Sequence, residues 1–258
     1  MRRVVWNIIK RGALVVLALV TLFIVYEVFT FPRVADLQTK NPETTSMIET
    51  RLKEAREQGR EPKRVQQWVL LARISPNLQR AVLAGEDSNF VAHNGFDYEA
   101  IQRAWDEGSK LSEKEAKEEG DNDPSDWIPD LSRFKRGGST VSQQLAKNLY
   151  LSSERTAARK IKEAAITYFM ERSLSKCRIL EIYLNVIEWG DGVYGAEAAA
   201  QTYFRKPAAS LTPQEAAFLS AMIPSPLNIF NPQKNLRRVQ RRQRVILRGM
   251  NSVRLPQC

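Results

Sequence analysis

The alternation of apolar and polar positions separates an N-terminal apolar run from a longer series of amphipathic segments. Residues 13–31 read ALVVLALVTLFIVYEVFTF and carry one charge, Glu27, near the far end. As a helix, these 19 residues would span roughly 28 Å at about 1.5 Å per residue, close to the hydrocarbon thickness of a bilayer. Four basic residues precede the run and no clear small-x-small cleavage site follows it, which favours an uncleaved anchor over a signal peptide. The pattern therefore predicts a cytoplasmic N-terminus over 1–12, a transmembrane anchor over 13–31 and an external remainder.

The remainder is interpreted as a stalk and lead-in over 32–64 and one helical domain over 65–258. Apolar residues at helical spacing, bounded by Gly and Pro, predict helices over 47–57, 78–90, 98–105, 176–189, 196–204 and 236–250. Asn77 is expected to cap the second of these, and Thr212 is expected to open a further helix. Only 65–74 carries a strand signal, so the predicted fold class is mainly α.

The charge of the chain limits its partners. Its 258 residues carry a net charge of +10 and a pI near 9.7, which indicates nucleic acid, anionic lipid headgroups or a phosphorylated substrate. An external domain argues against nucleic acid and in favour of lipid phosphates. The two cysteines, Cys177 and Cys258, lie far apart without metal-ligand spacing, so neither a disulfide framework nor a zinc site is expected.

One segment departs from the helical pattern. Residues 106–126 are acidic and poor in apolar side chains, which predicts a mobile surface insertion. An apolar stripe follows it and has two open interpretations, ordinary core packing or a membrane-dipping patch: Trp127, Ile128, Leu131 and Phe134.

The first candidate for chemistry is the stretch over 85–97. Glu86 and Asp87 follow an apolar run at the end of a predicted helix, and Phe90 and the only histidine, His93, come next. A carboxylate beside apolar surface tends to have a raised pKa, which suits general acid or base catalysis near neutral pH. The alternative is a solvated acidic pair at a helix end.

A second polar stretch lies over 137–148. Its two glycines allow close backbone approach, and Ser139 or Thr140 can cap the next helix, whose N-terminal amides favour anions. That helix brings five polar residues to one face, which indicates a site for sugar hydroxyls and phosphate oxygens rather than a solvated face. They are Thr140, Gln143, Gln144, Lys147 and Asn148.

Cations then recur at helical spacing beside one carboxylate, Glu163. Arg155, Arg159 and Lys162 make a group that could bind a diphosphate and keep Glu163 ionised. An ordinary charge run on a helix surface is the alternative. The GxGxxG pattern at 190–195 follows a helix rather than a strand, so nucleotide binding is not predicted.

Four motifs stand in order along the chain. They are EDxxFxxHxGxD over 86–97, GGSTxxQQLAKN over 137–148, RKxKE over 159–163 and ILExYLNxxxxGxGxYG over 179–195. Together they resemble the glycosyltransferase family 51 domain of peptidoglycan polymerases over roughly 65–248. No penicillin-binding transpeptidase domain follows, so the chain resembles the monofunctional members. The resemblance implies a mainly α, lysozyme-like transglycosylase domain with a small jaw lobe that would contain 106–126.

The resemblance also implies an activity. Members polymerise lipid II into β-1,4 glycan strands with inversion and release of the lipid diphosphate, without a nucleotide sugar. By position, Glu86 matches the general base and Glu163 a second catalytic carboxylate. The implied substrate-binding residues are Asp87, Phe90, His93, Ser139, Thr140, Gln143, Gln144, Lys147, Asn148, Arg155 and Arg159.

The implied partners are lipid II, the growing glycan strand, the membrane and proteins of cell division or cell-wall synthesis, with no nucleic acid. The implied location is the bacterial inner membrane, with one membrane pass and a periplasmic catalytic domain. No cofactor and no metal ligand are assigned, and a divalent cation such as Mg or Mn stays an option. Two alternatives remain, a lysozyme-like glycan-cleaving enzyme and a non-catalytic membrane-anchored scaffold. The cation-bearing helices favour a diphosphate leaving group, which a finished glycan lacks.

Overall fold

The computed structural model describes residues 2–103, 106, 138–152, 154 and 156–258. The chain divides into two compact units, Met1–Arg33 and Val34–Cys258. Most of the expected acidic insertion and the whole apolar stripe behind it lie outside the described residues.

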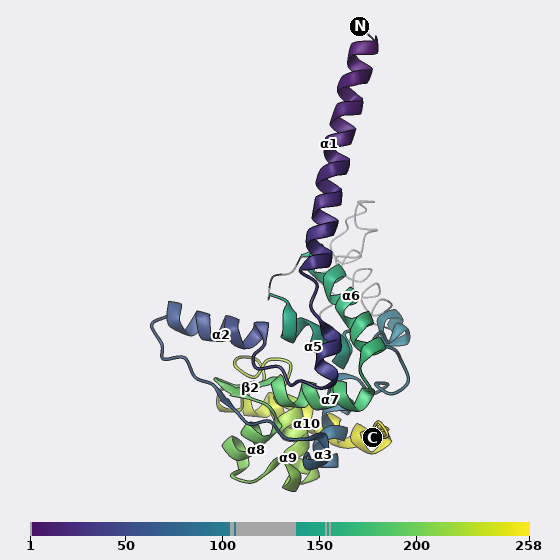
Figure 1. Cartoon of the computed structure of the whole chain (residues 1–258). Helices are drawn as coiled ribbons and strands as arrows, with labels where there is room; N and C mark the ends of the chain where they lie inside the picture. Colours follow the sequence, from purple (N-terminus) through teal and green to yellow (C-terminus); the bar gives the residue numbers. More distant parts are fainter. Residues whose placement is uncertain (1, 104–105, 107–137, 153, 155) are drawn as a thin grey trace, which may run out of the picture. The chain divides into compact units, whose positions relative to one another are not determined.

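The first unit is one helix, α1 (Arg2–Phe29) (Figure 1). The apolar run expected over 13–31 is therefore helical up to Phe29. Among the residues that the structure describes, no helix combines the length and the apolar composition needed to cross a bilayer. The role of this run as an anchor stays a prediction.

The second unit is mainly helical, as the sequence predicts. Its long helices are α2 (Ser46–Glu57), α3 (Pro76–Glu86), α5 (Val141–Tyr150), α6 (Ala157–Ser173), α7 (Lys176–Val186), α8 (Ala196–Phe204), α9 (Pro213–Met222) and α10 (Pro232–Gly249). Short 3-10 turns connect them: η1 (Val34–Gln38), η2 (Leu71–Arg73), η5 (Ala208–Ser210) and η6 (Met250–Ser252). Residues 98–103 are also helical, in agreement with the helix predicted there.

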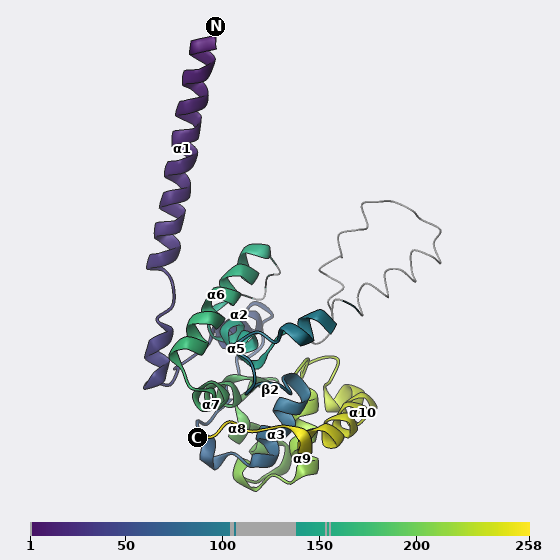
Figure 2. The ribbon, with the colours of Figure 1, turned by 90° about the vertical axis from the view of Figure 1, so that its right-hand side faces the viewer.

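Helix α7 forms the centre of this unit. Seven of its residues are buried, from Ile179 to Val186 with Glu181 as the exception. Figures 1 and 2 place α7 below α5 and α6 and above α8 and α9. Burial on nearly all sides explains why this segment reads as strongly apolar in the sequence.

Two predicted helices end earlier than expected. The helix over 78–90 ends at Glu86, because Asp87 leaves the helical conformation and acts as its C-cap. The helix over 176–189 ends at Val186, and the chain then forms β2 (Glu188–Gly190), which pairs with β3 (Val193–Tyr194). β3 also pairs in parallel with β1 (Val65–Gln66), so the sheet order is β1-β3-β2.

A glycine makes this turn from α7 into the sheet possible. Gly195 has φ +83°, and a Cβ there would lie 2.7 Å from the carbonyl oxygen of Asn185. Both the left-handed backbone and the close approach exclude other residues. The close contact between Gly195 and Asn185 joins positions ten residues apart, and a local alternation of apolar residues does not reveal it. For this reason the sequence predicts a strand only over 65–74 and misses β2 and β3.

The helix caps agree with the sequence in part. Thr212 and Glu215 form the expected capping box of α9, and Thr140 rather than Ser139 caps α5. The cap expected at Asn77 is wrong. Ser75 accepts from the Asn77 N–H, and Pro76 occupies the first turn, where its missing N–H costs nothing.

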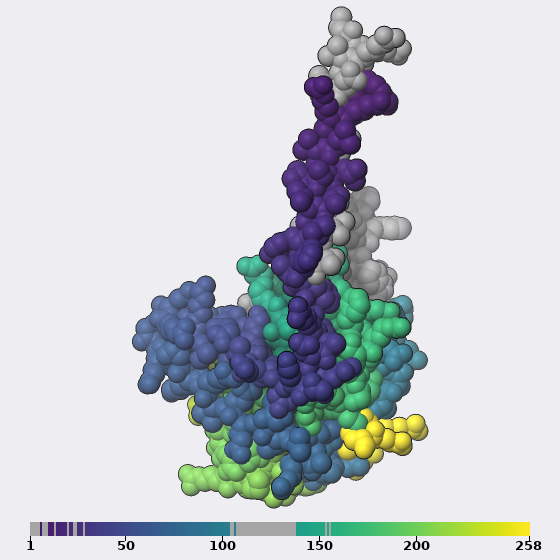
Figure 3. Space-filling view, in the orientation of Figure 1, coloured from purple at the N-terminus to yellow at the C-terminus, as the bar shows by residue number. Residues whose placement is uncertain are grey.

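The expectation that the two cysteines form no disulfide framework is also wrong. Cys177 and Cys258 form a disulfide with Cα atoms 5.8 Å apart. The fold returns the end of the chain, yellow at the surface in Figure 3, to the start of α7 across 81 residues of sequence. Cysteine spacing alone does not reveal this proximity.

Candidate active site

The carboxylate of Glu86 lies at the end of α3 and is almost buried, with 9% of its side chain exposed. Its Oε2 accepts a hydrogen bond from Nε2 of Gln144 on α5 at 2.9 Å. Its Oε1 accepts from Nη2 of Arg242 on α10, also at 2.9 Å. The same Arg242 nitrogen donates to the carbonyl oxygen of Gly85. Three helices therefore fix the position of one carboxylate.

Opposing effects set the pKa of Glu86. Burial raises it, because the charged form loses hydration. The charge of Arg242, the hydrogen bonds from Gln144 and Arg242 and the charge of Lys147 lower it. Burial prevails, and the pKa of Glu86 lies above that of an ordinary glutamate. This is the property that the sequence suggested for a carboxylate beside apolar surface.

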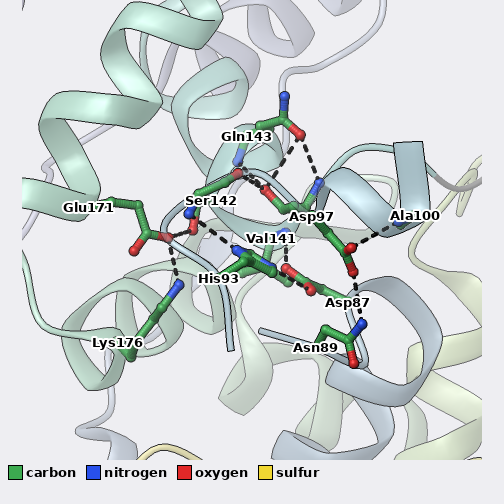
Figure 4. Close-up of polar contacts among 12 residues, drawn as sticks. Asp87, Asn89, His93, Asp97, Ala100, Val141, Ser142, Gln143, Glu171 and Lys176 are labelled. Atoms are coloured by element: carbon green, nitrogen blue, oxygen red, sulfur yellow. Dashed lines mark hydrogen bonds and ion pairs between the residues drawn. The ribbon is translucent and has the colours of Figure 1, made fainter. Parts of the chain in front are cut away.

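Asp87 faces the other way and connects α3 to α5. Its Oδ2 accepts from the N–H of Val141, the first residue of α5, at 2.9 Å. Its Oδ1 lies 2.9 Å from Nε2 of His93, while Nδ1 of His93 accepts from the N–H of Gly95 (Figure 4). Asp87 is thus a junction between helix ends, and His93 supports it.

Phe90 is fully buried beneath this junction. Its ring meets the ring of His93 edge to face, with centroids 6.4 Å apart, and Nζ of Lys176 lies 4.4 Å from its centre. Lys176 also pairs with Glu171 at 2.8 Å, and the Ser142 hydroxyl donates to the same carboxylate. The residues that the first motif places after Glu86 therefore form a packed, hydrogen-bonded support.

The polar face expected on α5 points largely into the protein. Thr140 and Gln143 are buried and bond to each other as a capping box, and the Thr140 hydroxyl also donates to the carbonyl oxygen of Gly95. Asn148 is buried, whereas Ser139 and Lys147 are exposed. Gln144 reaches Glu86. Of the five expected residues, Gln144 and Lys147 are the ones the structure brings close to a candidate catalytic carboxylate.

The second carboxylate, Glu163 on α6, has a side chain that is 4% exposed. Its Oε2 accepts from Nη1 of Arg159 at 2.8 Å, and its Oε1 pairs with Nζ of Lys160. Arg159 lies where the sequence predicts. Arg155 lies outside the described residues.

Lys147 connects the two carboxylates electrostatically. Although the residue is exposed, protein atoms packed around its amino group remove part of its hydration, and this lowers the pKa of Lys147. Glu163 and Glu86 raise that pKa, and Arg159 and Lys160 lower it. The net pKa of Lys147 is below that of an ordinary lysine. Glu86, Glu163 and three cations therefore share one electrostatic environment.

The described residues do not fit a resident metal. No group of three or more His, Cys, Asp or Glu in the described part of the chain could hold an ion. Both oxygens of Glu163 already pair with Arg159 and Lys160, so a divalent cation at Glu163 would have to displace them.

A cavity of about 940 Å³ lies beside the Asp87 junction, lined among others by His93, Asp97, Tyr168 and Glu171. Neither Glu86 nor Glu163 lines it. It is therefore separate from the two carboxylates.

Comparison with known proteins identifies the family of this chain. A family model described as Transglycosylase matches residues 52–120 and 127–251, a range that contains both carboxylates. This chain belongs to the transglycosylase family. Among curated relatives, "Biosynthetic peptidoglycan transglycosylase" of Laribacter hongkongensis is 42% identical over 93% of this chain and 96% of its own. Proteins of the same name from Thiobacillus denitrificans and Nitrosospira multiformis are 41% and 39% identical, over 98% and 92% of this chain and 99% and 94% of their own.

The sequence does not single out three residues that surround the candidate carboxylates. Tyr183 lies in the apolar helix over 176–189, Arg242 in the helix over 236–250, and Lys160 in the RKxKE motif. A buried tyrosine needs a hydrogen-bond partner, which was a usable signal for Tyr183. Nothing in the sequence distinguishes Arg242 from its neighbours, because its partner Glu86 lies 156 positions away.

The Asp87 junction predicts a stability effect. Asp87→Ala removes the acceptor of a helix-terminal N–H and of His93, and should lower the free energy of unfolding by about 2–4 kcal/mol. Asp87→Asn keeps one acceptor and should cost less. Urea unfolding measures both. As a control, Asp191→Ala removes an exposed ion pair of 3.6 Å with Arg60 and should change stability by less than about 0.5 kcal/mol. Equal losses for Asp87→Ala and Asp191→Ala would contradict the junction.

Proposed function

We propose that this chain is a peptidoglycan glycosyltransferase that polymerises lipid II into β-1,4 glycan strands. The configuration inverts and the lipid diphosphate leaves. The observation that carries the proposal is the buried carboxylate of Glu86, with a raised pKa, which shares the electrostatic influence of Lys147 with the cation group around Glu163. Family membership and the names of the curated relatives support the same reaction.

In the proposed reaction, Glu86 is the general base. The 4-hydroxyl oxygen of the acceptor sugar attacks the anomeric carbon of the donor, and its proton passes to the carboxylate. The bond from the anomeric carbon to the diphosphate oxygen breaks, and its electron pair leaves with the lipid diphosphate. Attack on the face opposite to the leaving group produces inversion. Gln144 and Arg242 take one lone pair of each Glu86 oxygen, and each oxygen keeps another that can accept the proton.

The group around Glu163 is proposed to receive the leaving diphosphate. Arg159, Lys160 and Lys147 supply positive charge where negative charge develops in the transition state. Glu163 holds two of these cations in place and limits their mutual repulsion. Asp87, Phe90 and His93 support this arrangement rather than touch the sugars, whereas Ser139, exposed before α5, is proposed as a substrate contact.

The cations also separate this proposal from its alternatives. Cleavage of a finished glycan needs no diphosphate site, and a scaffold needs no buried base. The matches to the three relatives named above cover 94–99% of those proteins' own length. The relatives therefore have little room for a second domain, which supports polymerisation without a transpeptidase activity. The lysozyme-like fold with a jaw lobe is proposed on family membership alone.

We further propose that residues 13–31 anchor the chain in the bacterial inner membrane, with the second unit in the periplasm. The support is the apolar run itself and a substrate that is linked to lipid. The disulfide between Cys177 and Cys258 supports an oxidising compartment. Partners in cell division or cell-wall synthesis remain expectations.

Loss of the base should abolish polymerisation. Glu86→Gln is expected to lower the rate of glycan formation from labelled lipid II by about 10²–10⁴-fold, as removal of an acid–base group does. Muramidase digestion identifies the product as glycan. Glu57→Gln, an exposed glutamate on α2, is the matched control and should be as active as the wild type. A polymerisation rate that survives Glu86→Gln would disprove the base assignment.

The raised pKa of Glu86 predicts how activity depends on pH. The base works only when it is deprotonated, so kcat/KM should fall as pH decreases through this pKa, above the pH of about 4.3 expected for an ordinary glutamate. Arg242 lowers the pKa of Glu86, so Arg242→Met should move this acidic limb to higher pH. A limb that stays in place or moves to lower pH in Arg242→Met would contradict the assignment.

The proposed anchor can be tested in the full chain. Leu17→Arg with Leu22→Arg places two charges in the apolar run, each costing about 2.5–3.5 kcal/mol in a membrane helix. The variant should be released from membranes by carbonate extraction. Leu70→Arg, at an exposed position of the second unit, should stay bound like the wild type. Retention of the double variant would argue against the anchor.

A further inference from the structure

The amide of Gln144 connects a hydrogen-bond acceptor, the carboxylate of Glu86, to a hydrogen-bond donor, the hydroxyl of Tyr183. On one side its Nε2 donates to Oε2 of Glu86 at 2.9 Å. On the other side its Oε1 accepts from the hydroxyl of Tyr183 at 2.8 Å. Tyr183 is fully buried in the central helix α7. A hydroxyl, an amide and a carboxylate thus form one continuous chain from α7 through α5 to α3.

The direction of this amide matters for the base. With Nε2 toward Glu86, Gln144 offers a donor, which favours the ionised carboxylate. If the amide turned by 180°, Oε1 would face Glu86, and an amide oxygen stabilises only a protonated carboxyl group. The two orientations have almost the same shape, so packing alone selects poorly between them.

We infer that Tyr183 is a positioning residue: its hydroxyl holds the Gln144 amide in the orientation in which Nε2 faces Glu86, and so keeps the base ready to accept a proton. This inference rests on the proposed function of Glu86. It also assigns Gln144 a role beside the base, in place of the sugar contact expected from the sequence.

The surroundings of Tyr183 keep its hydroxyl as the donor in the hydrogen bond to Oε1 of Gln144. Burial first, and then the charges of Glu86 and Asp87, raise the pKa of Tyr183 well above that of an ordinary tyrosine, although Arg242 opposes them. Its hydroxyl therefore keeps its proton at any working pH, and the oxygen of Gln144 always has a donor. The other charged groups that act on Glu86 are Arg242 from α10 and Lys147 from α5, and neither contacts the Gln144 oxygen through a hydrogen bond described for this part of the chain.

The test is the pH profile of lipid II polymerisation by the full chain. Tyr183→Phe frees the amide to turn, so the acidic limb of kcat/KM should move up by roughly 0.5–1 pH unit, about a three- to tenfold change in the acid dissociation constant of the base. Activity on the alkaline side should be nearly unchanged, because there Glu86 is ionised in either orientation. A purely structural role of the hydroxyl would instead lower activity equally at every pH.

Two further variants make the test specific. Tyr203→Phe removes the hydroxyl of a half-buried tyrosine, which donates to the carbonyl oxygen of Trp189 at 2.8 Å, and should leave the limb in place. Gln144→Met removes the amide and should itself move the limb upward. Adding Tyr183→Phe to Gln144→Met should cause no further shift, because Tyr183 acts through the amide.

The outcomes separate this inference from the proposed function. If wild type polymerises lipid II and Glu86→Gln does not, but the limb of Tyr183→Phe is unmoved, the inference is overturned and the function stands. A full additional shift in the double variant also overturns it. If Tyr183→Phe does not fold, an acidic limb that stays in place in Gln144→Met also overturns the inference. If wild type forms no polymer, both proposals fall.

Discussion

The structure depends on how one buried carboxylate is held. Glu86 loses most of its hydration at the end of α3, and without partners it would be protonated or would destabilise the fold. Donors from α5 and α10 compensate for this loss only in part, so the pKa remains raised while the side chain stays fixed. Both consequences suit a general base. The junction of Asp87 with the first N–H of α5 then fixes the distance between the helices that carry the base and its donor.

The second carboxylate is held in the opposite way. Glu163 is also nearly buried, yet two cations contact it directly and Lys147 lies within electrostatic reach. One glutamate is therefore poised to take a proton, and the other organises positive charge. Because Lys147 responds to both carboxylates, a negatively charged leaving group beside it would be bound close to the base. In the proposed reaction, this difference lets Glu86 act as the base while Glu163 organises the cations around the leaving group.

Local sequence patterns predicted those parts of the structure that depend on neighbouring residues in the chain. The presence of the helices and the capping box at Thr212 follow from spacing and capping chemistry, and the structure confirms them, although α3 and α7 end earlier than predicted. Contacts between distant segments were not predictable in this way. Arg242, the disulfide and the strands after α7 all depend on how the chain returns on itself. The polar face of α5 shows the limit most clearly, since spacing identified Thr140 and Gln143 but not that they bond to each other. Family motifs identified Glu86 and Glu163, and their partners required the structure.

The most direct measurement is the protonation of Glu86 itself. A ¹³C NMR titration of glutamate carboxyl carbons in the full chain, with Glu86→Gln to assign the signal, reports this without any assumption about turnover. A midpoint above the value of about 4.3 for an ordinary glutamate is expected, because the effect of burial on the pKa of Glu86 outweighs those of Arg242, Gln144 and Lys147. A midpoint at or below the ordinary value would contradict the claim that a buried, partly compensated carboxylate is the base.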